Sequence, residues 1–343
     1  MVVQRRVKNR WIPVLSGLLA AVLLASAGAL WWLQRPFDLP GDGSTPLDLT
    51  IPAGSSARQV GQRIHEAGVS TPAWLLHAWL RLSGRSRQVQ AGSYEIGVGT
   101  TPLQLLDRLV RGEQALRRVT LVEGWNWRQV LQAIKGAEQL SWDLPDAAQR
   151  DPAALMRALG LKEQHPEGRF FPDTYLYPKR GQASTLLRQA ALAMDRQLAL
   201  AWAERAPGLP LKSPEEALIL ASVVEKETGA NADRAQVAAV FVNRLRLGMR
   251  LQTDPTVIYG LGAAFDGNLR KRDLLTDNPY NSYTRAGLPP TPIAMPGLAS
   301  IRAALNPADS QALFFVARGD GSSHFSATLD EHNRAVRRYV LSR

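Results

Sequence analysis

The feature that most constrains this chain is an apolar stretch near its start, which covers residues 11–33. The stretch holds no charged side chain. A helix that rises about 1.5 Å per residue is then long enough to cross a hydrocarbon layer about 30 Å thick. Trp11, Trp31 and Trp32 lie at its two ends, where indole rings favour the lipid–water interface. The stretch therefore predicts a transmembrane helix.

Basic residues flank this helix unevenly. Four precede it within residues 1–10, whereas Arg35 is the only one that follows it closely. The positive-inside rule makes residues 1–10 a cytoplasmic tail and places the rest of the chain outside. A cleaved signal peptide is the alternative, with Ala-Ser-Ala at 25–27 as its cleavage site. The apolar stretch continues past that site, which favours a retained single-pass anchor.

The composition excludes several kinds of site. The 343 residues include no cysteine, so a disulfide framework, a thiol nucleophile and a cysteine metal site are excluded. The five histidines show no metal-ligand spacing, and no phosphate-binding or dinucleotide-binding motif occurs. The net charge of +11 favours polyanions, but the basic residues form no long run interleaved with aromatics. We expect no cofactor, no metal and no nucleic-acid partner.

Beyond the anchor, the pattern predicts an α+β protein with two folded domains. Residues 34–46 are rich in Pro, Gly and Asp and form a linker. Residues 47–116 alternate short strand and helix patterns, which is typical of a small α+β module. Residues 117–343 form a larger mixed α+β domain, mostly helical over 126–205 except for a loop at 166–181. In the module, strands are expected at 47–52 and 91–97, and helices at 56–68, 71–84 and 101–113.

One predicted helix of the larger domain ends with charged residues. Ser213 begins a capping box and Gly229 provides a stop, so a helix is expected over 214–228. Its last turn carries Glu225 and Glu227 after a long apolar run. Negative charge at this end opposes the helix dipole, and the pKa of a carboxyl there tends upward, as a general acid requires.

The two glutamates cannot share a face, because residues two apart lie about 200° apart around a helix. Glu227 follows Leu220, Val223 and Val224 on the bulky apolar stripe, so desolvation falls mainly on its carboxyl. Glu225 lies on a face with smaller and more polar residues. We predict Glu227 as the general acid, with Glu225 as the second choice. A pair of solvated charges at a helix end is the alternative.

Two proline-rich loops of this domain suit a saccharide. Residues 278–297 contain five prolines together with tyrosines and asparagines, which makes a rigid polar and aromatic loop. The loop at 166–181 has a similar composition and is either one wall of a sugar cleft or a plain packed loop. Further helices are expected over 233–248 and 329–341, with a hairpin over 312–328.

Four stretches of the chain carry long and ordered motifs. They are SVVEKET at 222–228, VFVNRLRLGMRLQTDPTVIYG at 240–260, NPYNSYTRAGLPP at 278–290 and HFSATLDEHN at 324–333. Together they resemble the endolytic murein transglycosylases, the MltG or YceG-like family. The resemblance covers nearly the whole chain and is weakest at 35–46 and 130–165.

The resemblance implies a membrane-anchored enzyme that cleaves peptidoglycan. The family cuts nascent glycan strands internally, between N-acetylmuramic acid and N-acetylglucosamine, and leaves a 1,6-anhydro end. It implies a LysM-like module at 47–116 and a YceG-like catalytic domain at 117–343 with a lysozyme-like catalytic helix. It further implies an inner-membrane location with the catalytic domain in the periplasm, a role in ending strand elongation, and association with peptidoglycan synthases.

The resemblance also implies roles for single residues. The family's catalytic glutamate is the second one of the Glu-Lys-Glu motif, which corresponds to Glu227 and agrees with the helix argument. A hydrolytic muramidase is one alternative, with Asp254 as its second carboxylate, and a non-catalytic glycan-binding scaffold is another. The substrate-binding residues implied are Asn243, Gln252, Asp254, Thr256, Tyr280, Asn281 and Tyr283.

Overall fold

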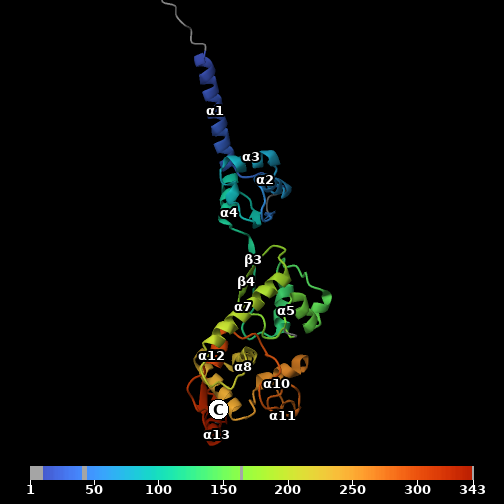
Figure 1. Cartoon of the computed structure of the whole chain (residues 1–343), viewed down its shortest axis with the longest axis vertical. Helices are drawn as coiled ribbons and strands as arrows, with labels where there is room; N and C mark the ends of the chain where they lie inside the picture. The colour runs from blue at the N-terminus through green and yellow to red at the C-terminus, as the bar shows by residue number, and fades with distance from the viewer. Residues whose placement is uncertain (1–10, 41–44, 163–164, 342–343) are drawn as a thin grey trace, which may run out of the picture. The chain divides into compact units, whose positions relative to one another are not determined.

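The computed structural model describes residues 11–40, 45–162 and 165–341. The chain divides into two compact units, Met1–Leu116 and Arg117–Arg343. Helices predominate in both units, and the described strands form three two-stranded sheets (Figure 1). The protein therefore has the mixed α+β fold that its sequence pattern predicts.

The first unit begins with α1 (Trp11–Gln34), the long helix at the start of the chain in Figure 1. Its segment Leu15–Gln34 is long and apolar enough to cross a membrane, and the most apolar window of that segment is not buried inside the protein. The guanidinium of Arg35 lies 5.1 Å from the centre of the Trp31 ring at the end of the helix. The apolar helix predicted for residues 11–33 is thus confirmed.

The rest of the first unit is a two-stranded antiparallel sheet with helices packed against it. β1 (Leu47–Ile51) pairs with β2 (Gly92–Ile96), and the buried side chains of Leu49 and Tyr94 lie opposite each other. A capping box at Thr101 starts the helix after β2. The helical elements are α2 (Ala57–Glu66), α3 (Ala73–Leu82), a 3-10 turn (Ser86–Gln88) and α4 (Pro102–Arg111).

The second unit starts with a small sheet in which β3 (Leu116–Thr120) pairs with β4 (Thr174–Pro178). β4 lies inside the segment 166–181, so the expectation of a loop throughout that segment was wrong. The alternation typical of a strand is present, because two tyrosines of β4 are buried while Leu176 between them is exposed. The surrounding prolines and glycines hide this short pattern in the sequence. The helices of this part are α5 (Trp127–Gly136), a 3-10 turn (Asp146–Gln149), α6 (Pro152–Leu159) and α7 (Ala183–Ala203).

Three helices form the centre of the remaining half of the second unit. α8 (Pro214–Glu227), α9 (Arg234–Arg246) and α12 (Leu298–Leu305) pack on one another, and every residue from 217 to 224 is buried. A helix that is apolar on all sides belongs in a core, so only the two ends of α8 reach polar surroundings. The other elements are a 3-10 turn (Asn231–Asp233), α10 (Asp254–Leu261), a 3-10 turn (Gly262–Ala264), α11 (Lys271–Leu275), β5 (Phe314–Ala317), β6 (Ser323–Ser326), α13 (Leu329–Val336) and a π-helix (Arg337–Leu341).

Candidate active site

Glu227 is the last residue of α8, and its carboxyl meets the residue that precedes α10. The Thr253 hydroxyl donates a hydrogen bond to Oε1 of Glu227. Thr253 is itself fixed, because its backbone N–H donates to the Ser282 hydroxyl at 3.0 Å and only 2% of its surface is exposed. Three segments that are distant in sequence therefore hold the carboxyl in place.

The surroundings of Glu227 favour its protonated form. Burial raises the pKa of the carboxyl most, the Thr253 hydrogen bond lowers it, and the negative charge of Asp254 raises it again. The net direction is upward, so Glu227 keeps its proton to a higher pH than an ordinary glutamate. The pKa of Glu227 is therefore raised, as its place at the helix end predicts, and desolvation is the main cause.

Glu227 opens onto a cavity of about 520 Å³. One part of the lining is polar and includes Gln252, Asp254 and Tyr283, while another part is aromatic. Planar rings beside hydrogen-bonding groups suit a ligand with both apolar faces and hydroxyl edges. The remaining lining residues are Arg244, Leu251, Phe314, Phe315, Leu329, His332 and Asn333.

Asp254 and Tyr283 are joined across this cavity. The Tyr283 hydroxyl donates to Oδ1 of Asp254 at 2.6 Å, and burial is the main cause that raises the pKa of the hydroxyl. Tyr283 therefore stays protonated and acts as a donor. Asp254 is exposed at the first position of α10, where the positive end of the helix dipole favours a carboxylate.

Gln252 has a backbone conformation that is uncommon for its residue type. Its φ is +51°, in the left-handed region that glycine adopts freely. Its backbone N–H donates to the carbonyl of Ser282 at 3.1 Å, and its side-chain oxygen accepts from Arg244 at 3.3 Å. Strained residues of this kind cluster where a chain must present a group to a ligand.

Arg244 is a buried cation that the sequence argument did not assign to the site. Its Nε donates to the carbonyl of Leu313 at 2.7 Å, and its Nη1 donates to the carbonyl of Leu251 at 2.8 Å. The guanidinium also lies 5.1 Å from the centre of the Phe314 ring. Arg244 thus ties α9 to the β5 hairpin and to the turn before Gln252. Its position inside an apolar helix was the available signal, because a buried cation requires such partners.

Four of the predicted substrate-binding residues support the site from behind. Thr256 and Asn281 have no exposed surface, so in this structure neither side chain touches the cavity. The Thr256 hydroxyl lies 2.7 Å from that of Ser282, and Nδ2 of Asn281 donates to the carbonyl of Thr276 at 2.7 Å. Both side chains support the wall of the site in this structure, and their contact with substrate stays a prediction.

Asn243 and Tyr280 are likewise engaged with the protein. Nδ2 of Asn243 donates to the carbonyls of Ser310 and Ala312, at 2.7 and 3.1 Å. The Tyr280 hydroxyl lies 3.0 Å from that of Thr291, and its ring packs edge-on against Tyr259 at 4.8 Å. Neither residue lines the cavity around Glu227. They fix the segment before β5 and the proline-rich loop.

Glu225, the second choice for the acid, has structural partners. Its Oε2 accepts the backbone N–H of Gly297 at 2.9 Å, and its Oε1 lies 3.9 Å from Arg234. Glu225 does not line the cavity that Glu227 lines. The two carboxyls therefore serve different surroundings, as their separation around the helix predicts.

Glu167 is a second glutamate with a raised pKa, and it is not among the site residues predicted from the sequence. Only 2% of its surface is exposed, and burial raises the pKa of its carboxyl to about 7. Its two oxygens accept the backbone N–H of Trp127 at 2.9 and 3.1 Å, and Oε2 accepts the Tyr259 hydroxyl at 3.0 Å. Glu167 therefore caps the start of α5 and joins it to α10.

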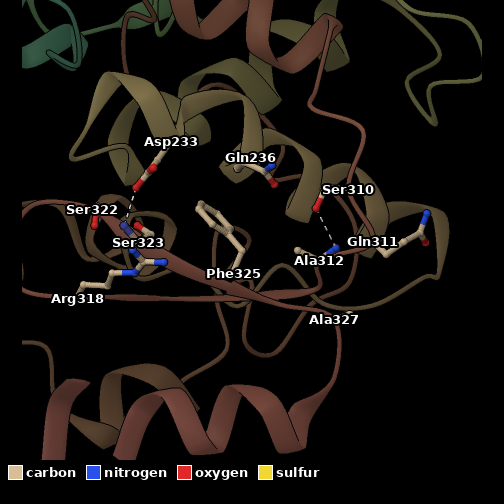
Figure 2. Close-up of a pocket in the computed structure, with 10 residues that line it drawn as sticks. All are labelled: Asp233, Gln236, Ser310, Gln311, Ala312, Arg318, Ser322, Ser323, Phe325 and Ala327. Atoms are coloured by element: carbon tan, nitrogen blue, oxygen red, sulfur yellow. Dashed lines mark hydrogen bonds between the residues drawn. The ribbon is translucent and has the colours of Figure 1, made fainter. Parts of the chain in front are cut away.

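A second pocket of about 530 Å³ is bordered by β6 (Figure 2). Asp233 accepts the backbone N–H of Ser323 there at 2.6 Å, and Figure 2 shows the Phe325 ring among the polar side chains. The predicted site residues all belong to the described part of the chain, and none of them lines this pocket. Within the described ranges, no cluster of three or more His, Asp or Glu side chains is placed to hold a metal ion.

A model of the YceG-like family matches residues 49–338 of the chain. The chain belongs to the YceG-like family. One relative of the chain is a Bacillus subtilis protein named endolytic murein transglycosylase. It is 32% identical over 325 residues, which cover 88% of this chain and 87% of the relative.

Two further relatives agree with this assignment. A Streptococcus pneumoniae protein of the same name is 27% identical, and the match covers 95% of this chain but 65% of that longer protein. A crystal structure of a putative YceG-like protein from Listeria monocytogenes is 30% identical. It covers 84% of this chain and 98% of its own, with a TM-score of 0.54. This YceG-like chain thus shares both sequence and fold with the family.

Proposed function

We propose that this YceG-like protein is an endolytic murein transglycosylase. It cleaves the bond between N-acetylmuramic acid and N-acetylglucosamine within a glycan strand and leaves a 1,6-anhydro end. The observation that carries the proposal is the Glu227 carboxyl, which lines an open cavity and whose pKa burial raises. The names of the B. subtilis and S. pneumoniae relatives support it.

The proposed reaction needs one carboxyl that acts twice. Neutral Glu227 donates its proton to the glycosidic oxygen, and the bond from that oxygen to the muramoyl anomeric carbon breaks as positive charge develops on the sugar. The Glu227 carboxylate then takes the proton of the C6 hydroxyl, whose oxygen bonds to the anomeric carbon. The ring closes, the carboxyl is protonated again, and no water is consumed.

A raised pKa suits both steps. A carboxyl that holds its proton to higher pH is present as an acid in a larger fraction of molecules, and its conjugate base is stronger. Thr253, which donates to Oε1, lowers the pKa and keeps the group from becoming too weak an acid. Tyr283 and Gln252 lie on the same cavity wall and are proposed to position the sugar.

A hydrolytic muramidase is the second candidate, because Asp254 lines the same cavity as Glu227. A hydrolase needs a second carboxylate as base or nucleophile. Oδ1 of Asp254 already accepts the Tyr283 hydroxyl, so this oxygen is engaged with the protein. This contact favours the transglycosylase.

The domain roles extend the proposal. We assign residues 1–10 to a cytoplasmic tail, 11–33 to a membrane anchor, 34–46 to a linker, 47–116 to a LysM-like module and 117–343 to the catalytic domain. The strand, helix, helix, strand order of the module supports its assignment. α8, a buried helix with an acid at its end, is proposed to act as the catalytic helix of lysozymes does.

The proposed location is the inner membrane, with the N-terminus in the cytoplasm and the catalytic domain in the periplasm. The charge-free α1 and the basic residues before it support this topology. An anchored enzyme that ends nascent strands works beside their source, so we propose association with peptidoglycan synthases. A membrane pull-down that recovers no synthase would contradict this association.

Mass spectrometry of released glycans tests the proposed reaction. The full chain in detergent and its Glu227→Gln variant are incubated with uncrosslinked peptidoglycan, with Glu225→Gln as the matched control. We expect internal fragments with anhydro ends from the wild type and from Glu225→Gln, and none from Glu227→Gln. Ends heavier by one water would identify a hydrolase. Absence of cleavage by all three proteins would leave a glycan-binding scaffold.

A further inference from the structure

The first unit contains an apolar groove of about 560 Å³ at the point where α1 meets the module. The end of α1 forms one side of it through Trp32 and Leu33. α3 contributes Leu75 and Leu82, and the start of α4 contributes Leu103. Most of its lining is apolar, although Ser83 and Arg85 also border it.

Large apolar side chains also point outward beside the groove. Leu82 is 88% exposed, Trp74 is 71% exposed and Leu103 is 45% exposed. Trp74, Ala78 and Leu82 are four residues apart along α3, so they lie on one face of that helix. Trp74 and Leu82 leave this face exposed among the described residues, and exposed apolar patches of this kind mark contact with an apolar phase or a partner.

The depth of the groove follows from its position on α1. Segment Leu15–Gln34 spans about 30 Å as a helix, which matches the hydrocarbon core, so Trp32 and Leu33 lie at its outer boundary. Trp32 packs edge-on against Trp79 of α3, with ring centres 6.0 Å apart. α3 therefore lies beside the end of α1, as Figure 1 shows.

We propose that lipid acyl chains of the leaflet at which α1 leaves the bilayer fill this groove, and that the outer face of α3 lies in the membrane interface. Trp74 and Leu82 then enter the apolar edge of the leaflet, where indole and leucine side chains are stable. Arg81, in the last turn of α3, lies at the level of the phosphate groups. The module is seated on the bilayer.

A seated module differs from one that hangs on a flexible tether. Its contacts with α1, such as that of Trp32 with Trp79, hold it at a fixed depth. Its apolar face is then unavailable to a glycan, so glycan contact falls on its other surfaces. The inference rests on the proposed membrane span of α1 and not on the proposed chemistry.

The experiment uses the absence of native cysteine, which makes every introduced thiol unique. A nitroxide spin label is attached to single-cysteine variants of the full chain in liposomes of phosphatidylethanolamine and phosphatidylglycerol. Leu82→Cys and Leu103→Cys report on the groove, and Leu24→Cys reports on α1. Arg111→Cys is the matched control, because it lies eight residues beyond Leu103 on α4, about 12 Å farther along the helix axis. Circular dichroism checks that each variant is folded.

Relaxation by oxygen, which concentrates in lipid, is compared with relaxation by a water-soluble nickel complex. We expect oxygen to dominate for the labels at positions 24, 82 and 103, and nickel to dominate at 111. If the labels at 82 and 103 behave like that at 111 while the label at 24 is in lipid, the anchor is real and the proposal is wrong. If nickel dominates at position 24, α1 does not lie in lipid, and the proposal is wrong because it rests on that membrane span. Strong spin–spin broadening at 82 would assign the face to a second copy of the chain. None of these outcomes depends on murein cleavage.

Discussion

Two glutamates of the second unit have carboxyls whose pKa is raised by burial, and their surroundings differ. Glu227 opens onto a cavity and accepts a hydrogen bond from the Thr253 hydroxyl. Glu167 is closed off, and it accepts hydrogen bonds from the Trp127 backbone and the Tyr259 hydroxyl. A raised pKa therefore identifies buried carboxyls in general. Access to a cavity separates the group that performs chemistry from the group that holds the fold together.

The largest expected effect is on activity, and it concerns the Glu227 carboxyl. Glu227→Gln removes the proton donor, and general acid catalysis contributes typically about 10²–10⁴-fold to a rate, so we expect a loss of cleavage in that range. The fold should keep its stability, because a neutral amide replaces a carboxyl that burial disfavours as an anion. Fragment release and thermal unfolding measure the two quantities. A variant that cleaves at half the wild-type rate would contradict the assignment.

The second effect concerns stability and belongs to Glu167. Its pKa rises from 4.5 to about 7 on folding, so between these values the folded protein binds more protons than the unfolded chain. The contribution of Glu167 is therefore most favourable below pH 4.5 and is lost as the pH rises through 7, by about 3 kcal/mol in total. Glu167→Gln should remove this slope.

Urea unfolding of the wild type and of Glu167→Gln between pH 4 and 8 measures the slope as a difference between the two proteins. Taking the difference cancels the similar contribution of Glu227, which is present in both. Parallel stability curves over this range would show that folding does not raise the pKa of Glu167. The proposed contrast between a closed and an open carboxyl would then fail.

The next pair of variants acts on the pH dependence of cleavage. Thr253→Val removes the hydrogen bond that lowers the pKa of Glu227, and Asp254→Asn removes the charge that raises it. An enzyme that needs protonated Glu227 loses activity as the pH rises through that pKa. The alkaline limb of kcat/KM should therefore move to higher pH in Thr253→Val and to lower pH in Asp254→Asn. Shifts in the same direction in both variants would rule out this origin of the limb.

The smallest effect is that of a single hydroxyl. Tyr259→Phe removes one donor to Glu167 while keeping the ring, which should cost about 0.5–1.5 kcal/mol when Glu167 is neutral and more when it is charged. Tyr175→Phe is the matched control, because its hydroxyl donates to the neutral carbonyl of Phe171. We expect the loss in Tyr259→Phe to be larger at pH 8 than at pH 5, and the loss in Tyr175→Phe to be equal at both. Equal losses in Tyr259→Phe would contradict the ionisation of Glu167.

The sequence predicts local features of this molecule well. Ser213 caps the helix predicted for 214–228, which the structure places at Pro214–Glu227, although the Glu216 side chain accepts the backbone N–H of Lys212 and forms no capping box with Ser213. The apolar helix and the strands and helices of the module follow from period and caps in the same way. β4 was missed, because the prolines and glycines in and around it favour the prediction of a loop.

Contacts between segments that are distant in the sequence cannot be predicted from periodicity and helix caps. The hydroxyl that binds Glu227 comes from Thr253, 26 residues away, and the Tyr259 that binds Glu167 lies 92 residues from it. Thr256 and Asn281 resemble ligand-binding residues by type, yet the fold turns both inward. Polar side chains support loops as often as they bind substrates, and only the packing of the whole unit decides which.

The most direct test asks which of the two raised carboxyls governs the chemistry. This test is the pH dependence of kcat/KM for the wild type and for Glu167→Gln. Both proteins are measured at a temperature at which they are folded, and the rate is divided by the concentration of folded protein. The account predicts that the alkaline limb persists unchanged in Glu167→Gln, because the limb belongs to Glu227. Loss of the limb in that variant would show that Glu167 is the group whose protonation the reaction needs, and would contradict the assignment of Glu227.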